Sequence, residues 1–227
     1  MISGPVIGTI TITLQPELVF SLIIMTALCI LFIYAGNKVK KANPLERPKG
    51  IVLVAETGVN MIYNYMKSIM PYQFEKNYYP YFAMIFVYLV CANLSGLLGF
   101  DSPTSNYSIT LAITLITFGL IQWNALKKKG GFTYVKDIVW PPTNIPGVFS
   151  PLISLSMRLF GNILSGTILM GLIYTFTGWV SNHLIPFNFL GPIVAPILHC
   201  YFDVFCGCIQ TLVFVTLSSI LIAVEAE

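Results

Sequence analysis

The chain has 227 residues, of which 56% are hydrophobic and only 9% carry a charge, with a formal net charge of +3. Soluble domains carry roughly 25% charged residues, so a soluble protein of this size would lack the polar side chains needed to cover its surface. Much of the chain must therefore be solvated by lipid, which excludes nucleic-acid readers, secreted disulfide scaffolds and ordinary cytosolic enzymes.

Uncharged stretches predict an all-α membrane protein with about five membrane-spanning helices. Each stretch is long enough to cross a hydrocarbon core of about 30 Å at about 1.5 Å per residue. The last two stretches are the longest, and the helix-breaking residues between them, Pro186 among them, predict a hairpin. The expected spans cover residues 17–37, 80–100, 107–126, 147–177 and 191–224, within a single membrane domain of residues 1–227.

Residues 51–70 are hydrophobic but predict an interfacial amphipathic helix rather than a span. Polar residues recur along one helical face, while apolar residues occupy the opposite face, as in helices that lie in the plane of a membrane surface. The polar residues are Glu56, Asn60, Asn64 and Lys67. The alternative is a helix outside the membrane that packs against the water-exposed part of the protein.

The distribution of positive charge predicts the topology. Eleven of the twelve Lys and Arg residues fall within 38–49, 67–76 and 127–136. Five spans place these three segments on one side of the membrane, and the positive-inside rule makes that side cytoplasmic. The N-terminus is then expected outside and the C-terminus in the cytoplasm.

The twelfth cation, Arg158, lies about eleven residues inside the fourth span. A charge at such a depth costs roughly 2.5–3.5 kcal/mol on insertion scales, so it marks a functional site by default. Ser154 and Asn162 lie four residues to either side and extend a polar helical face. A structural clamp between Arg158 and Asp203 is the alternative.

The fifth span carries a matching series of polar side chains. His199, Asp203, Cys206 and Gln210 follow one another at i, i+4, i+7 and i+11, which places them on one face of a regular helix. Groups that take up and release a proton at intervals are what a water-filled ion pathway requires. For His199 an ordinary buried hydrogen bond is an equal alternative, and Gln210 is also of the type that joins neighbouring helices.

Around these residues the chain resembles subunit a of the F-type ATP synthases. The resemblance rests on residues 156–166 (SMRLFGNILSG) and on the final segment 201–214, and it covers essentially the whole chain. It implies a non-catalytic ion-channel subunit in the stator of a rotary ATP synthase, with two aqueous half-channels beside a ring of c subunits. It also implies that Arg158 faces the ring's ion-binding carboxylate, and that Asn162 and Gln210 match the family's motif asparagine and glutamine.

The sequence departs from the family pattern at Thr167. Many members carry an acid or a histidine at this position, nine residues after the arginine, and that side chain lines a half-channel. Threonine cannot titrate, whereas Asp203 falls where other members place a histidine or an acid. We therefore expect Asp203 to be the main titratable group of the half-channel.

The resemblance also implies partners: the c-ring subunits, the peripheral-stalk b subunits and, through the complex, the soluble ATPase head, with no nucleic acid. A multi-pass location in a bacterial plasma membrane is expected. Protons are the expected coupling ion and sodium is the alternative, because the choice depends mainly on the c-ring carboxylate site, which is on another chain. The alternative function is a stand-alone ion or solute transporter with a site between the last two helices, but the internal repeat typical of that class is missing. A membrane enzyme would need clustered nucleophiles, and the chain has only two histidines, His183 and His199.

No cofactor and no metal are expected. The five cysteines are odd in number and lie in apolar runs, which favours small packing residues over a metal site. No Lys or Arg precedes Lys38, so the first apolar run lacks the positive region of a signal peptide and is expected to stay in the mature protein.

Overall fold

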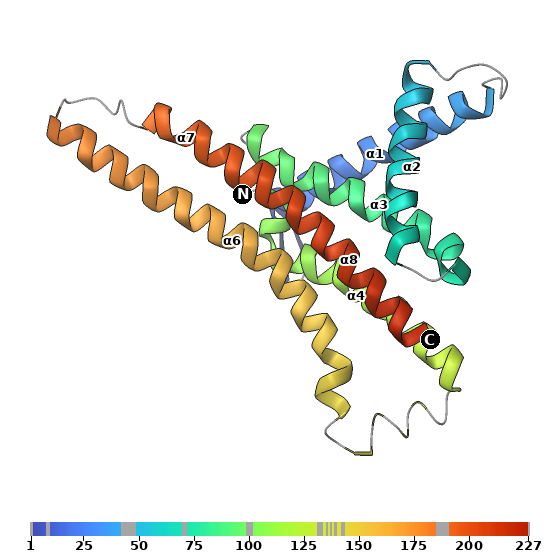
Figure 1. The fold of residues 1–227 in the computed structure, drawn as a ribbon. Coiled ribbons are helices and arrows are strands. Elements are labelled where there is room, and N and C mark those ends of the chain that lie inside the picture. The colour runs from blue at the N-terminus through green and yellow to red at the C-terminus, as the bar shows by residue number, and fades with distance from the viewer. Residues whose placement is uncertain are drawn as a thin grey trace.

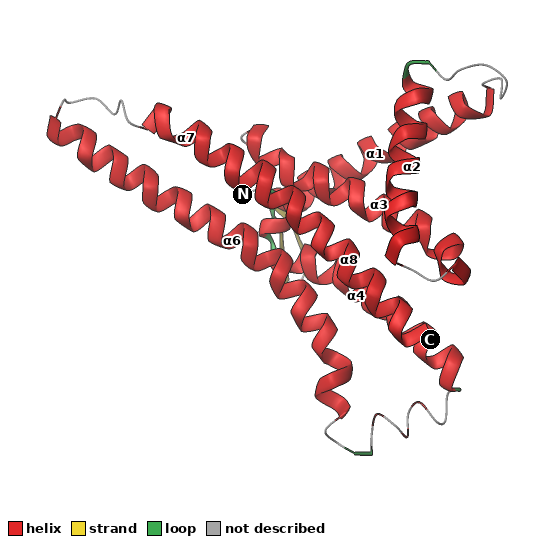
Figure 2. Cartoon of the chain, in the orientation of Figure 1, coloured by secondary structure: helices red, strands yellow, loops and turns green. Residues whose placement is uncertain are grey.

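The computed structural model describes residues 2–7, 10–41, 49–69, 72–98, 102–130, 134, 136, 138, 140–141, 144–184 and 191–226. Helices dominate this part of the chain (Figure 2). Five of them are long and apolar enough to cross a membrane, which confirms the predicted helical membrane architecture. In chain order the elements are β1 (Ile2–Ile7), β2 (Ile10–Leu14), α1 (Pro16–Lys41), α2 (Ile51–Ile69), α3 (Tyr72–Leu94), two short 3-10 turns (Ser95–Leu98 and Pro103–Ser105), α4 (Tyr107–Lys129), α6 (Asn144–Leu184), α7 (Gly191–His199), a π-helical segment (Cys200–Cys206) and α8 (Gly207–Ala226).

A short antiparallel hairpin precedes the first membrane helix. Strands β1 and β2 pair with Ile2 opposite Leu14 and Ile7 opposite Ile10. The sequence of β2 is ITITL, and β-branched residues such as Ile and Thr favour strands because their stiff side chains fit a pleated backbone. The hairpin is an addition to the helical architecture that the long apolar runs do not predict.

The last two spans are long helices that lie side by side (Figure 1). Helix α6 contains 41 residues, more than the predicted span of 147–177. The last span is one continuous run from Gly191 to Ala226, in which the π-helical segment Cys200–Cys206 joins α7 to α8. Helix α4 contacts both α6 and α8. The helix-breaking run of residues 178–191 predicts the turn of the hairpin, but α6 continues as a helix to Leu184, so the first part of that run is helical. Residues 185–190 lie outside the described residues.

The hydrophobic core is centred on α8. Its largest fully buried side chains come from α8 and from the helices around it, and they include Phe214 on α8, Phe82 and Leu89 on α3, and Leu159 on α6. Helices α1, α2 and α3 lie on the side of α8 away from α6 (Figure 1). Only 11% of the most apolar stretch of α6 is buried, against 50% for the last helix. One long face of α6 is therefore left for lipid or for another subunit.

Helix α2 is not among the spans, and its apolar side packs against the protein. Met66 is fully buried, and the Tyr79 hydroxyl on α3 donates a hydrogen bond of 2.9 Å to the Val59 carbonyl oxygen. The polar residues Asn60 and Asn64 are exposed on the other side, as the amphipathic pattern predicts. The apolar side of α2 thus packs against the protein, as the alternative interpretation has it. The location of α2 at the membrane surface stays a prediction.

Candidate functional site

A cavity of about 370 Å³ lies between α6 and the last helix, and the end of α3 with the residues that follow it forms one of its walls. It brings together four of the six residues singled out from the sequence. These four are Asn162 and Thr167 on α6 and His199 and Asp203 on the last helix. Arg158 and Gln210 are not among its lining residues. The cavity therefore unites the titratable groups and leaves the arginine outside.

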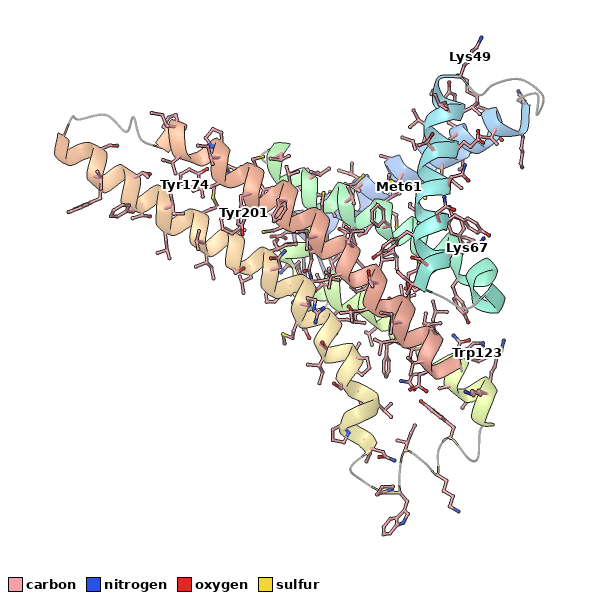
Figure 3. The ribbon with its side chains drawn as sticks, in the orientation of Figure 1. Lys49, Met61, Lys67, Trp123, Tyr174 and Tyr201 are labelled. Atoms are coloured by element: carbon pink, nitrogen blue, oxygen red, sulfur yellow. The ribbon has the colours of Figure 1, made fainter. Side chains whose placement is uncertain are left out.

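A chain of hydrogen bonds crosses this cavity from one helix to the other. The Nδ1 atom of His199 lies 2.7 Å from Oδ2 of Asp203, one helical turn away. The Nε2 atom of the same imidazole lies 2.8 Å from the hydroxyl oxygen of Tyr174, on α6. Figure 3 places Tyr174 between α6 and the last helix. Both ring nitrogens of His199 are therefore engaged.

Asp203 sits at a place where the backbone leaves room for a carboxylate. Its side chain is 23% exposed and faces Gly96, in the 3-10 turn after α3. A Cβ added to Gly96 would lie 3.3 Å from Cγ and Oδ2 of Asp203, closer than most such contacts. The missing side chain of Gly96 thus makes space for the carboxyl group beside the cavity.

The π-helical segment interrupts the polar face predicted for the last helix. A π-helix closes its hydrogen bonds at i+5 and so takes more residues per turn than an α-helix. Across this segment the regular spacing from His199 to Gln210 is lost. Asp203 lines the cavity, whereas Gln210 is buried, with 7% of its surface exposed. The prediction of a single face that carries both residues is therefore corrected by the local backbone geometry.

Arg158 lies on the exposed face of α6, away from the core. Arg158 and its neighbour Met157 are both exposed, Met157 at 53%, whereas the next residue, Leu159, is fully buried. Among the described residues the only ion pair is between His199 and Asp203, so the alternative of a clamp between Arg158 and Asp203 is not formed. A permanent positive charge in a membrane span thus forms no ion pair with any acidic residue that the structure describes.

Thr167 has its hydroxyl group committed to its own helix. The Oγ1 atom donates toward the carbonyl oxygens of Ile163 and Leu164, at 3.1 and 2.9 Å. Such local bonds are typical of threonine in membrane helices. Thr167 contributes a polar wall to the cavity but no titratable group.

Asn93 is a residue of this region that the sequence analysis missed. Its Nδ2 donates a hydrogen bond of 3.0 Å to the Gly207 carbonyl oxygen, and its Oδ1 accepts one of 3.1 Å from the Thr104 hydroxyl. An amide within an apolar span was the signal that could have revealed it, because polar residues inside membranes are rare and usually face a partner. Asn93 fixes α3 to the last helix beside the π-helical segment.

A substitution at Gly207 tests whether this close approach of α3 and α8 is required. A Cβ at Gly207 would lie 2.9 Å from Cβ of Asn93, too close for either backbone to stay in place. We expect Gly207→Ala to lower the amount of assembled subunit in membranes by several-fold, measured by quantitative immunoblotting. Gly119→Ala is the matched control, because a Cβ at Gly119 meets nothing within 4 Å. Equal amounts of the two variants would show that the contact is not required.

A second cavity of about 310 Å³ lies at the opposite end of α6. Its polar lining comes from four segments of the chain, namely from Gln122, Tyr134, Asn144 and Glu225. Burial, and then the negative charge of Glu225, raise the pKa of Tyr134, so its phenol stays protonated. On α6 this cavity reaches Pro151, seven residues before Arg158. The first cavity begins at Asn162, four residues after it.

Comparison with known proteins identifies the family. The model of the family described as ATP synthase A chain matches residues 18–223. The chain belongs to this family. A protein of Mycoplasma pneumoniae named ATP synthase subunit a is 33% identical over 221 residues, which cover 86% of this chain and 74% of that protein.

Two further relatives come from Helicobacter pylori and Acaryochloris marina. A subunit a of Helicobacter pylori (strain P12) is 28% identical, over 88% of this chain and 86% of that protein. A protein of Acaryochloris marina named ATP synthase subunit a 2 is 24% identical, over 95% of this chain and 87% of that protein. As a member of the ATP synthase A chain family, the chain is a multi-pass, ion-translocating membrane subunit of an ATP synthase and not a catalytic one. This membership decides against a stand-alone transporter.

Proposed function

We propose that this ATP synthase subunit a is the stator element that passes protons to and from a ring of c subunits. The observation that carries the proposal is the order of features along α6. A cavity reaches Pro151, a second cavity begins at Asn162, and Arg158 lies between the two levels on the exposed face. Two half-channels that end on either side of a fixed positive charge fit this order.

Arg158 is the group that acts on the ring. A ring carboxylate must lose its proton on reaching the stator, yet an unpaired carboxylate in lipid is very costly. The guanidinium of Arg158 is always charged, so it stabilises the carboxylate while the two face one another. The same charge repels a proton that would cross directly between the cavities. Protons must then travel around with the ring, and each charge that crosses yields about 2.3 kcal/mol per 100 mV.

The cavity between α6 and the last helix is the outer half-channel. Asp203 is its main titratable group, with His199 beside it and Thr167 as part of the polar wall. Asn162 lines the cavity one helical turn from Arg158, so the half-channel extends along α6 to the depth at which the ring carboxylate faces Arg158. Gln210 is buried on the same helix, seven residues after Asp203, and its Nε2 atom has no hydrogen-bond partner in the part of the chain that the structure describes. This donor is therefore free to serve a group that changes its charge.

The cavity at the other end of α6 is the inner half-channel. Glu225 and the protonated Tyr134 give it a polar lining next to the cytoplasm. The orientation follows from the charges: Lys38, Lys40 and Lys41 end α1, and Lys127 and Lys128 end α4, which places these ends inside. The N-terminus is then outside and the C-terminus inside a bacterial plasma membrane.

The partners follow from the exposed faces and from the family. The exposed face of α6 around Arg158 is the surface for the c-ring. The peripheral-stalk b subunits hold this subunit still against the soluble ATPase head, so that the ring turns relative to it. The apolar exposed residues of α1 meet lipid or the stalk. Residues 1–227 act as a single membrane domain in this role.

Water access tests the two half-channels. In a subunit whose five native cysteines are replaced, we expect Thr167→Cys to react with a membrane-impermeant thiol reagent from the outer side. Pro151→Cys is expected to react from the cytoplasmic side, because each residue lines one of the two cavities. A labelling rate at least about tenfold above that of a lipid-facing cysteine is expected, since only the thiolate reacts and it forms in water.

Two residues on the exposed face of α6 are the matched controls. Ile153 and Leu172 are 59% and 66% exposed but line neither cavity. Cysteines at these positions should stay unlabelled from both sides. Labelling of Thr167→Cys from the cytoplasmic side, or equal labelling of the control positions, would contradict two separate half-channels.

A further inference from the structure

One contact in the cavity is explained neither by the family motif of residues 156–166 nor by the series of polar side chains on the last helix. Tyr174 lies sixteen residues after Arg158 and reaches from α6 across to His199. It follows Thr167 by seven residues, two helical turns, so both side chains line the same cavity. Although Tyr174 is 42% exposed, its hydroxyl oxygen lies 2.8 Å from Nε2 of the imidazole. The contact therefore joins the two helices of the proposed half-channel.

The two bonds of His199 define a preferred tautomer. A carboxylate can only accept hydrogen bonds, so when Asp203 is ionised the proton of a neutral imidazole is on Nδ1 and points to Oδ2. The other nitrogen, Nε2, then carries a lone pair and accepts a hydrogen bond from the Tyr174 hydroxyl. A group that bonds one ring nitrogen thus decides what the other nitrogen can do.

We propose that Tyr174 is a positioning residue of the outer half-channel, which holds the imidazole of His199 in the orientation and tautomer that keep an N–H directed at Asp203. Tyr174 acts through His199 and does not itself carry the proton. Without its hydroxyl, the bond to Asp203 alone holds the ring, so the imidazole turns more freely and populates orientations and tautomers in which no N–H is directed at Asp203. This inference rests on the proposed role of Asp203 as the titratable group of the half-channel.

The geometry of the cavity supports this role for Tyr174. Among the described residues that line the cavity, Asp203 and Tyr174 are the two whose side chains bond the imidazole. Thr167 on α6 also lines the cavity, but its hydroxyl is bonded to its own helix. Tyr174 is therefore the side chain through which α6 acts on the titratable pair.

Removal of the hydroxyl alone tests the inference in the intact ATP synthase. In membrane vesicles, Tyr174→Phe is expected to lower ATP-driven proton pumping about three- to tenfold per assembled complex, the range of one hydrogen bond. The aromatic ring stays, so packing is kept. Tyr34→Phe is the control, because Tyr34 on α1 is similarly exposed and is not among the residues that line the cavity, so its variant should pump normally.

Coupling to His199 separates positioning from packing. If Tyr174 acts through the imidazole, Tyr174→Phe has no further effect in a His199→Ala background. The tautomer is read directly by ¹⁵N NMR of the complex with histidine-labelled subunit, for which a His199→Ala sample identifies the signal. We expect a single protonated Nδ1 in the wild-type protein and a mixture of tautomers in Tyr174→Phe.

Normal pumping by Tyr174→Phe, an equal loss in both backgrounds, or an unchanged ¹⁵N signal would each overturn the inference. The proposed function is tested separately. If Asp203→Asn and Arg158→Ala stop pumping while Tyr174→Phe pumps normally, the half-channel stands and only the role of Tyr174 falls. If Arg158→Ala pumps normally, the proposed function itself is wrong.

Discussion

Vesicles with Arg158→Ala are expected to lose ATP-driven proton pumping and proton-driven ATP synthesis by at least about a hundredfold. Removing one partner of a buried charge pair costs about 3–5 kcal/mol, because the other charge is left without compensation. For a ring carboxylate that must ionise beside the stator, this cost enters the barrier to rotation, and about 1.4 kcal/mol corresponds to tenfold in rate. Arg158 is exposed and forms no ion pair within the described residues, so the complex should still assemble.

Arg158→Lys is expected to fail as well. An ammonium group lacks the planar fork of guanidinium, holds its water more strongly and loses its proton more readily when desolvated. Lys67→Ala is the control, because Lys67 is an exposed cation on α2, away from both cavities. Synthesis at the wild-type rate in Arg158→Lys vesicles would contradict the mechanism.

Asp203→Asn is expected to reduce synthesis and pumping by at least about tenfold, while ATP hydrolysis by the released soluble head continues. Asparagine keeps the size of the side chain and can still bond His199, but it cannot take up and release a proton. No other acidic residue is among the described residues that line this cavity. The relay between outer water and the ring then lacks its carboxyl group.

Two further variants test whether titration at position 203 is what the relay requires. Asp203→Glu should retain part of the activity, because it still titrates, although Gly96 leaves little room for one more methylene group. His199→Ala combined with Asp203→Asn should pump less than either single variant if the imidazole takes over part of the relay. Normal pumping by Asp203→Asn would place the relay elsewhere.

Much of this architecture could be predicted from the sequence because it depends on long apolar runs. The five spanning helices, the amphipathic pattern of residues 51–70 and the isolated cation Arg158 are features of composition and spacing. Their physical cause is local, since a helix in lipid must satisfy its own backbone hydrogen bonds. The resemblance in residues 156–166 then indicated the family, which the comparisons confirm.

The arrangement inside the cavity was harder to predict, because it depends on contacts between helices. The π-helical segment around Asp203 removes the regular spacing that placed Gln210 on the same face. Tyr174 and Asn93 lie on other helices, and only packing brings them to His199 and to Gly207. Spacing within one helix carries no information about such pairs.

Arg158 separates two aqueous paths in this mechanism, and passive proton flow through the membrane sector measures that separation directly. The soluble head is removed, and the ring carboxylate is replaced by a neutral group, so that the ring carries no protons. With Arg158 present, vesicles under a membrane potential should then stay proton-tight. With Arg158→Ala in the same vesicles, protons should leak between the two cavities, because the repelling charge is gone. Equal tightness of both vesicles would contradict Arg158 as the barrier, and a leak in the presence of Arg158 would contradict it as well.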